Sequence, residues 1–235
     1  MTVHNVVSPD EWTLARRALL HKEKEFQRLR DELSQARRAL PWARVDAAYE
    51  FDGAAGRETL ASLFDGHSQL LVYHFMFAPD WEVGCKSCAF WADNFNGITA
   101  HLAQRDVAFA AVSRAPYAKL AAFAKRLGWN FKWVSSENST FNFDFRVSFR
   151  AEDVANGNAR YNDSPYAGTM TDLPGLSVFF KDADGTLFHT YSTYARGIDP
   201  FNVAYQLLDV VPKGRDEAAL PHPMAWVRFH DSYTA

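Results

Sequence analysis

Hydrophobic and polar residues alternate with helical spacing along the N-terminal part of the chain. Ser8, Pro9 and Glu11 form a helix start, because serine caps the first turn, proline suits its first position and glutamate follows the cap by three residues. The pattern predicts one long helix from there to about Ala39. Apolar residues recur along it every seven positions: Trp12, Leu19, Phe26, Leu33 and Leu40. Ala15, Leu29 and Ala36 fill most of the second seam, which Lys22 interrupts.

A single apolar stripe on so long a helix must pack against something. Two interpretations stay open at this point. The helix packs on its own domain, or it forms an arm that embraces a second subunit and makes the protein a homodimer.

The rest of the chain alternates between apolar runs and helical periodicities, which predicts an α/β fold. The predicted strands are 45–51, 69–77, 107–113, 131–135, 176–181 and 186–192. The predicted helices are 89–103, 116–127 and 199–210. The strand, helix and strand over residues 69–113 form a βαβ unit with parallel strands, and the turn residues 182–185 indicate a hairpin between the last two strands.

Turn-forming residues and apolar residues also divide the chain into parts. We expect an N-terminal helical arm over residues 1–41, a main domain over 42–212 and a C-terminal tail over 213–235. Turn formers are dense over about 150–172, which predicts a long insertion that either covers the functional site or has no role in it. Tyr161 and Tyr166 are the candidate anchors of this insertion, and Trp226, Val227 and Phe229 predict that the end of the tail docks on the domain.

The chain has two cysteines, Cys85 and Cys88, at the junction between the predicted strand 69–77 and the helix after it. A thiol at a helix N-terminus meets unpaired backbone N–H groups and the positive end of the helix dipole, which favour the thiolate, and Lys86 adds positive charge. The spacing of three residues keeps both sulfurs on one side of the first turn, within range of a disulfide. The pair therefore predicts two-electron redox chemistry, in which Cys85 attacks and Cys88 resolves the mixed disulfide.

Two other interpretations of the cysteines stay open. A closed zinc site needs four ligands, and the chain has no second cysteine pair, so histidines would have to be recruited by folding: His67, His74, His101 and His189. Two unrelated buried cysteines are the plainer alternative, although chance seldom places the only two cysteines of a chain on such a junction. We expect no metal ion and no bound cofactor.

The composition restricts the class of protein. With 235 residues, 48% of them hydrophobic, the chain can bury the core of one elaborated domain. The net charge of −3 argues against a nucleic-acid-binding protein. No apolar run is long enough to span a membrane, and the first residues lack the basic start and apolar segment of a signal peptide. We therefore expect a cytoplasmic protein that binds neither nucleic acid nor membranes, in which a lone cysteine pair is more often catalytic or redox-sensing than structural.

Several motifs carry a resemblance to a bacterial family. They are the strand and the tryptophan before CKSC, and the runs FWADNFNG (90–97), AVSRAP (111–116), WVSS (133–136) and FHTYSTYARG (188–197). From about Glu11 to its C-terminus the chain thereby resembles the family called domain of unknown function 899. The resemblance implies a thioredoxin-like fold with a peroxiredoxin-like elaboration, in which helices flank a central mixed sheet. The family is described as predicted dithiol-disulfide oxidoreductases. The resemblance also implies that Pro174, just before the strand that faces the cysteines, is a cis-proline shaping a substrate groove.

Thiol-disulfide exchange is the expected function. Trp81, Lys86 and Ser87 would border the groove beside the cysteine pair. The partners would be a protein or small-molecule disulfide as substrate and an unknown thiol as electron donor.

Two alternatives stay open. In a peroxidase, Cys85 would become a sulfenic acid and condense with Cys88. The sequence lacks the threonine of the peroxiredoxin pattern PxxxTxxC, and Arg114 after the predicted strand 107–113 is either the supporting cation of such a site or a solvated charge. In a redox-gated binding module, the disulfide would act as a switch while the long helix presents a partner surface.

Overall fold

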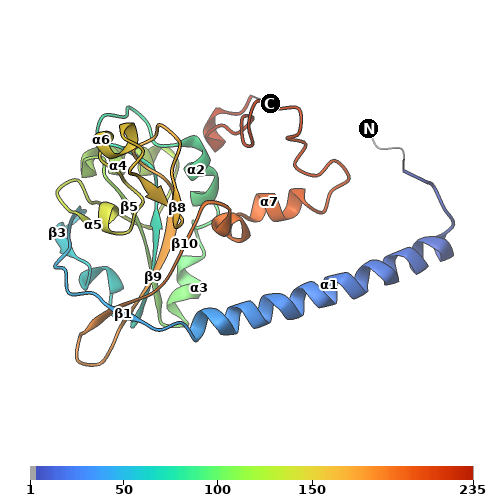
Figure 1. Ribbon diagram of the computed structural model, residues 1–235, viewed down its shortest axis with the longest axis horizontal. Coiled ribbons are helices and arrows are strands. Elements are labelled where there is room, and N and C mark those ends of the chain that lie inside the picture. Colours follow the sequence, from blue (N-terminus) through green and yellow to red (C-terminus); the bar gives the residue numbers. More distant parts are fainter. Residues whose placement is uncertain (1–3, 235) are drawn as a thin grey trace. The chain divides into compact units, whose positions relative to one another are not determined.

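The computed structural model describes residues 4–234 of the chain, which divides into two compact units, Met1–Pro41 and Trp42–Ala235 (Figure 1). The helices are α1 (Pro9–Arg38), α2 (Lys86–Ala92), α3 (Thr99–Ala103), α4 (Tyr117–Arg126), α5 (Phe141–Asp144), α6 (Ala151–Ala155) and α7 (Val203–Leu208), with the 3₁₀ helices η1 (Ser62–Phe64), η2 (Ala195–Phe201) and η3 (His230–Ser232). The strands are β1 (Ala43–Arg44), β2 (Glu50–Gly53), β3 (Gly56–Thr59), β4 (Gln69–His74), β5 (Val107–Ser113), β6 (Lys132–Ser135), β7 (Arg160–Tyr161), β8 (Ser164–Pro165), β9 (Gly175–Lys181) and β10 (Leu187–Tyr194).

The first unit contains α1, which confirms the predicted long helix. Ser8 caps it, and the hydroxyl of Ser8 accepts a hydrogen bond from the backbone of Glu11, whose carboxylate accepts one from the backbone of Ser8. This reciprocal arrangement satisfies two donors that the first turn would otherwise leave unpaired. No residue of α1 is buried. Over residues 4–234, no helix combines the length and the apolar character needed to cross a membrane.

In the second unit, eight of the described strands form one mixed sheet with the order β1-β10-β9-β4-β5-β6-β2-β3. The neighbours β4, β5 and β6 are parallel, whereas β9 runs antiparallel to both β4 and β10. The predicted βαβ unit and the predicted hairpin are thus both present. A separate short ribbon, β7 with β8, lies within the predicted insertion.

Side chains alternate along β4 and β5 and fill a hydrophobic cluster on each face of the sheet. Tyr73 and Phe75 belong to the cluster that also contains residues of α2 and α4. Leu70 and Val72 belong to the other, which contains residues of η1 and α5. Helices therefore flank the central sheet, as Figure 1 shows for the second unit. The C-terminal end of β4 lies between these two layers and leads into the cysteine segment.

The strand predicted over 45–51 is wrong. The chain forms two short strands instead, β1 and β2, which lie at or near opposite edges of the sheet: β1 pairs with β10, and β2 pairs with β3 and β6. One continuous strand cannot occupy both edges, so the residues between Arg44 and Glu50 carry the chain across.

The single helix predicted over 89–103 is also wrong, because α2 and α3 are separate. The side-chain amide of Asn94 donates to the carbonyls of Phe90 and Trp91 at 2.7 and 3.1 Å, which ends α2. Gly97 then adopts a φ of +91°, which a residue with a side chain rarely adopts. The closing helix predicted over 199–210 is likewise divided, into η2 and α7, at Asn202.

Candidate active site

The two cysteines lie at the start of α2, after the loop that follows β4. Cys85 is the N-cap residue of α2, and its sulfur accepts the backbone N–H of Cys88 at 3.5 Å. The backbone of Met76, just beyond β4, binds both residues: its carbonyl accepts the N–H of Cys85 at 3.0 Å, and its own N–H donates to the sulfur of Cys88 at 3.5 Å. These bonds hold the first turn of α2 against the end of the central strand.

The surroundings of the two thiols differ. Cys85 remains partly exposed, whereas Cys88 is buried with 2% of its surface exposed. A hydrogen bond from the side chain of Cys88 is the main cause that lowers the pKa of Cys85 to about 7, assisted by the backbone N–H groups of Cys88 and Ser87 and by the Ser87 side chain, and opposed by burial. Burial raises the pKa of Cys88 well above its ordinary value, and the hydrogen bond and charge of Cys85 raise it further. Cys85 is therefore the thiol that is both accessible and readily ionised.

Tyr73 is part of this site, although the sequence analysis did not single it out. Its hydroxyl donates to the carbonyl of Cys88 at 3.4 Å, and its hydrogen bond to the Cys88 side chain lowers the pKa of that thiol, against the larger effect of burial. Burial raises the pKa of Tyr73 itself well above the ordinary value, so the hydroxyl stays a donor. A lone tyrosine in an apolar strand next to two cysteines was an available signal, because a buried hydroxyl usually needs a partner.

The loop before Cys85 is held in place by Lys119 and by close packing. The ammonium of Lys119 donates to the carbonyls of Pro79 and Trp81, both at 2.9 Å. A Cβ at Gly84 would approach the ring of Phe75 to 2.7 Å, so only glycine fits this close passage. Trp81 packs against the same hydrophobic cluster as Cys85.

Lys86 and Ser87 follow Cys85 in the first turn of α2 but have different partners. Ser87 contributes hydrogen bonds to Cys85, as described above. The ammonium of Lys86 donates instead to the carbonyl of Ala225 at 3.2 Å, in the C-terminal tail. The tail docks as predicted: Val227 is fully buried, and Trp226 and Phe229 pack against the cluster beneath α2.

Pro174 precedes β9, whose first residue lies opposite His74 at the end of β4. The expectation of a cis-proline is wrong, because residues 4–234 contain no cis peptide bond. Two hydrogen bonds fix the approach to β9 instead. The N–H of Leu173 donates to Val147 at 2.8 Å, and the hydroxyl of Tyr161 donates to the carbonyl of Pro174 at 2.5 Å.

Tyr161 anchors the insertion to the segment before β9. Besides its bond to Pro174, its hydroxyl accepts the backbone N–H of Ala195 at 2.8 Å. Burial is the main cause that raises its pKa. The insertion thus reaches the start of β9, whose first residue lies opposite His74 at the end of β4. Tyr166, the other candidate anchor, stacks on Phe149.

Arg114 follows β5 and is bound to another group. Its guanidinium forms two parallel hydrogen bonds to the carboxylate of Asp172, at 2.8 and 2.5 Å, and lies over the ring of Phe143. Asp172 is buried and also accepts a hydrogen bond from Ser148 at 2.8 Å. The charge of Arg114 is therefore neutralised within this cluster.

The histidines named as possible zinc ligands have other surroundings. His74 and His189 are joined through two serine hydroxyls: His74 Nε2 to Ser177 Oγ at 2.8 Å, Ser177 to Ser192 at 2.8 Å, and Ser192 to His189 Nε2 at 2.7 Å. In the described part of the chain, no three histidine, cysteine or acidic side chains are grouped so that they could hold a metal ion.

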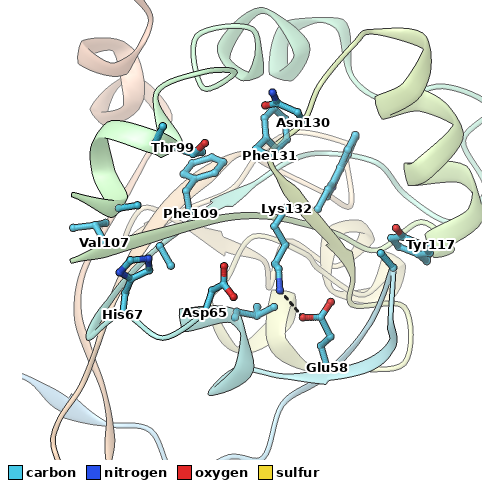
Figure 2. Close-up of a pocket in the computed structure, with 16 residues that line it drawn as sticks. Glu58, Asp65, His67, Thr99, Val107, Phe109, Tyr117, Asn130, Phe131 and Lys132 are labelled. Atoms are coloured by element: carbon cyan, nitrogen blue, oxygen red, sulfur yellow. Dashed lines mark hydrogen bonds and ion pairs between the residues drawn. The ribbon is translucent and has the colours of Figure 1, made fainter. Parts of the chain in front are cut away.

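Figure 2 shows a pocket of about 540 Å³ that is distinct from the cysteine site. Val107 and Lys132, the first residues of β5 and β6, line it together with His67, which precedes β4. The dashed line in Figure 2 marks the ion pair of Lys132 with Glu58, at 2.7 Å. Because the cysteines follow the last residue of β4, the pocket lies at the opposite end of the parallel strands.

Residues 1–233 match a family described as "Bacterial protein of unknown function (DUF899)". The chain belongs to this family. The resemblance noted in the sequence is thereby confirmed, and DUF899 covers both the helical arm and the domain with the cysteines. None of the curated proteins compared with it matches.

Solved structures resemble this DUF899 protein at low identity. A peroxidoxin BcpB from Mycobacterium tuberculosis is 15% identical, with 72% of this chain and 97% of that chain covered and a TM-score of 0.47. A peroxiredoxin Q from Xanthomonas campestris is 12% identical, with 70% and 93% covered and a TM-score of 0.48. A thiol:disulfide interchange protein from Bacteroides sp. is 12% identical, with 76% and 97% covered and a TM-score of 0.43. The mixed sheet of the second unit, flanked by helices as predicted, has the strand order β6-β5-β4-β9-β10 at its centre, and the cysteines follow β4.

Proposed function

We propose that the protein is a thiol-disulfide oxidoreductase in which Cys85 is the nucleophile and Cys88 the resolving thiol. The observation that supports this most directly is the asymmetry of the pair. Cys85 is partly exposed with a pKa of about 7, while Cys88 is buried and has a pKa well above its ordinary value. At neutral pH the Cys85 sulfur is thus a nucleophile, and the Cys88 thiol beside it stays protonated.

The reaction proceeds in two exchanges. The Cys85 thiolate attacks one sulfur of a substrate disulfide, whose S–S bond breaks as the mixed disulfide forms and the first substrate thiolate leaves. Cys88 then loses its proton and attacks the sulfur of Cys85, which releases the second substrate thiolate. The protein ends as a Cys85–Cys88 disulfide, and the substrate has gained two electrons. An external dithiol returns the protein to its reduced form.

The electrostatics of the pair favour this order of events. While Cys85 is a thiolate, its charge and its hydrogen bond raise the pKa of Cys88. Formation of the mixed disulfide removes that negative charge, so the pKa of Cys88 falls at the stage where its thiolate is needed. Met76 and Tyr73 donate hydrogen bonds to Cys88 and stabilise the resolving thiolate. Trp81, Ser87 and Pro174 are proposed to border the bound substrate.

Peroxide reduction is the second candidate, because a Cys85 sulfenic acid would also lie beside Cys88 and could condense with it. The state of Arg114 favours disulfide exchange. The cation proposed to assist a peroxidase is bound to Asp172 by two hydrogen bonds, and its charge is already neutralised.

Turnover by single-cysteine variants tests the proposal. With a small aromatic disulfide and a dithiol donor, we expect Cys85→Ser to lose at least about a hundredfold in rate, because no other thiol is accessible and ionised. Cys88→Ser should retain the first attack and accumulate a mixed disulfide that mass spectrometry detects on Cys85. Peroxide consumption by the same preparations, measured in parallel, separates the two enzymatic candidates.

Full exchange activity in Cys85→Ser would exclude the proposed nucleophile. Consumption of peroxide without turnover of disulfides would assign the pair to the second candidate. If neither substrate reacted, the pair would not be an enzymatic site, and a redox-gated binding role would take its place.

A further inference from the structure

The apolar stripe of α1 is not buried within its own unit. Trp12 and Phe26 are 60% and 65% exposed, and Leu19, Leu29 and Leu33 are each about half exposed. The helix nevertheless runs for 30 residues, or ~45 Å at ~1.5 Å per residue. Helices in proteins gain most of their stability from packing an apolar face, so a continuous apolar stripe along α1 indicates a surface that packs against it. The stripe therefore requires an occupant.

The stripe has the seven-residue repeat of a coiled coil, whose positions are named a to g. Trp12, Leu19, Phe26, Leu33 and Leu40 take position a, and Ala15, Lys22, Leu29 and Ala36 take position d. Positions e and g flank this seam on either side. Position e holds Arg16, Glu23, Arg30 and Arg37, and position g holds Glu11, Ala18, Glu25, Glu32 and Ala39. The g side thus carries only negative or neutral residues, whereas the e side is mostly arginine.

We propose that α1 forms a parallel, in-register coiled coil with α1 of a second copy of this chain. In a parallel pair, each g residue faces the e residue of the next heptad on the other helix. This places Glu11, Glu25 and Glu32 against Arg16, Arg30 and Arg37 of the second copy, with no pair of like charge. An antiparallel pair would place g against g and e against e, so glutamates would meet glutamates or alanines, and most e residues would meet arginines.

Glu25 and Arg30 form the pair that depends most on the second copy. Neither side chain has an ion-pair partner among the described residues, whereas Glu32 pairs with Arg28 of its own helix at 3.2 Å and Glu11 belongs to the cap at Ser8. Each dimer contains this pair twice. Because both α1 helices end at the same end of a parallel coil, the two Trp42–Ala235 units of the dimer begin side by side.

Lys22 is the one charged residue in the seam, and the charges around it fit the same arrangement. In register it lies near Lys22 of the second copy, and each helix carries Glu23 one residue and Glu25 three residues further on, so four carboxylates accompany the two ammonium groups. A long lysine side chain can reach out of the seam toward them. A single polar seam residue lowers the stability of a coiled coil but fixes its register.

Sedimentation equilibrium on charge variants of the full-length chain tests the pairing. We expect Glu25→Lys to raise the dimer dissociation constant by about 3- to 10-fold, because two attractive contacts become repulsive. The double variant Glu25→Lys with Arg30→Glu should restore the original value. Asp31→Lys is the matched control, since it makes the same change of charge at position f, which faces away from the seam, and it should leave the constant unchanged.

Pulsed EPR distances test the orientation. Spin labels are placed one at a time at the outward positions Arg17, Lys24 and Arg38, in a chain with Cys85→Ser and Cys88→Ser. The parallel coil predicts a similar short distance at all three. A short distance at Lys24 with long ones at Arg17 and Arg38 would overturn the parallel arrangement. A chain that stays monomeric at 100 µM, about the upper range for a weak specific dimer, would overturn the proposal altogether.

Discussion

Cys85 carries its sulfur at the first turn of α2, where hydrogen bonds from Cys88 and Ser87 stabilise the thiolate more than burial disfavours it. Cys88 has the opposite balance, because it is buried and faces the charge of Cys85. Two residues of the same chemistry thus acquire different roles from their surroundings. A free thiol titrates near ~8.5, so the difference should appear directly as a pH dependence.

We expect the rate of alkylation of Cys85 by iodoacetamide to rise with pH around a midpoint near 7 and to level off above it. The sign follows from the lowered pKa, because only the thiolate reacts and it becomes the major form above the midpoint. Cys88 should stay unmodified throughout this range. Mass spectrometry after timed quenching between pH 5 and 9, a range of about two units on each side of the midpoint, measures both sites. A midpoint at or above the value of a free thiol would contradict the proposed activation.

The chain of hydrogen bonds that joins His74 to His189 has a donor-to-acceptor direction, which follows from the number of protons available. Three hydrogen bonds join the four groups, but the hydroxyls of Ser177 and Ser192 supply only two protons, so one imidazole must donate. His74 Nδ1 is buried without a hydrogen-bond partner among the described residues, and a proton there would be an orphaned donor. His74 therefore donates through Nε2, and Ser192 donates to His189.

This assignment predicts the tautomers of both rings. Long-range ¹⁵N–¹H correlation spectra should show His74 protonated at Nε2 and His189 protonated at Nδ1. Burial lowers the pKa of His74 to about 3, so its ring should stay neutral in the folded protein down to mildly acidic pH. Ser177→Ala should remove the acceptor of His74 and reduce the free energy of unfolding by about 1–3 kcal/mol. A spectrum with the proton of His74 on Nδ1 would reverse the proposed direction.

Elements with strong local signals were predictable from the sequence. The start of α1 follows from the cap at Ser8, and β5 occupies the residues expected from its apolar run. The hairpin of β9 and β10 follows from its turn residues. In each case the deciding contacts lie a few residues apart, so the pattern of nearby residues contains them.

The break between α2 and α3 involves, besides the local hydrogen bonds of Asn94, contacts that no local pattern contains. Asp93, at the end of α2, accepts hydrogen bonds from Trp129 and His230, both at 2.8 Å and both far away in the sequence. Apolar spacing alone continues through this point, which is why one helix was expected. The same reasoning applies to the site. The cysteines with Lys86 and Ser87 are neighbours in sequence and were found, whereas the parts played by Tyr73, Met76 and Lys119 depend on pairings between distant segments.

At the end of the sheet that leads to the cysteines, segments far apart in the sequence contact one another. The tail contacts α2 through Lys86 and Ala225, and the insertion contacts β9 through Tyr161 and Pro174. Arg114 and Asp172 join the end of β5 to the end of the insertion. Only the last of these is a buried ion pair, with side-chain exposures of 17% and 3%. Loss of the Arg114–Asp172 ion pair should therefore lower the free energy of unfolding more than loss of either of the other two contacts.

The replacement Arg114→Met should leave the carboxylate of Asp172 buried without its counter-charge, and we expect urea unfolding to show a loss of about 3–5 kcal/mol. The matched control is Arg126→Met, which removes a similar two-bonded pair with Asp231 that lies nearer the surface, at exposures of 40% and 30%, and it should cost far less than Arg114→Met. The double variant Arg114→Met with Asp172→Leu should recover much of the loss, because neither charge is then stranded. If Arg114 acts only as this brace, the alkylation midpoint of Cys85 in folded Arg114→Met protein should stay near 7. A midpoint that rose instead would mean that the guanidinium stabilises the Cys85 thiolate. That result would favour peroxide reduction over disulfide exchange.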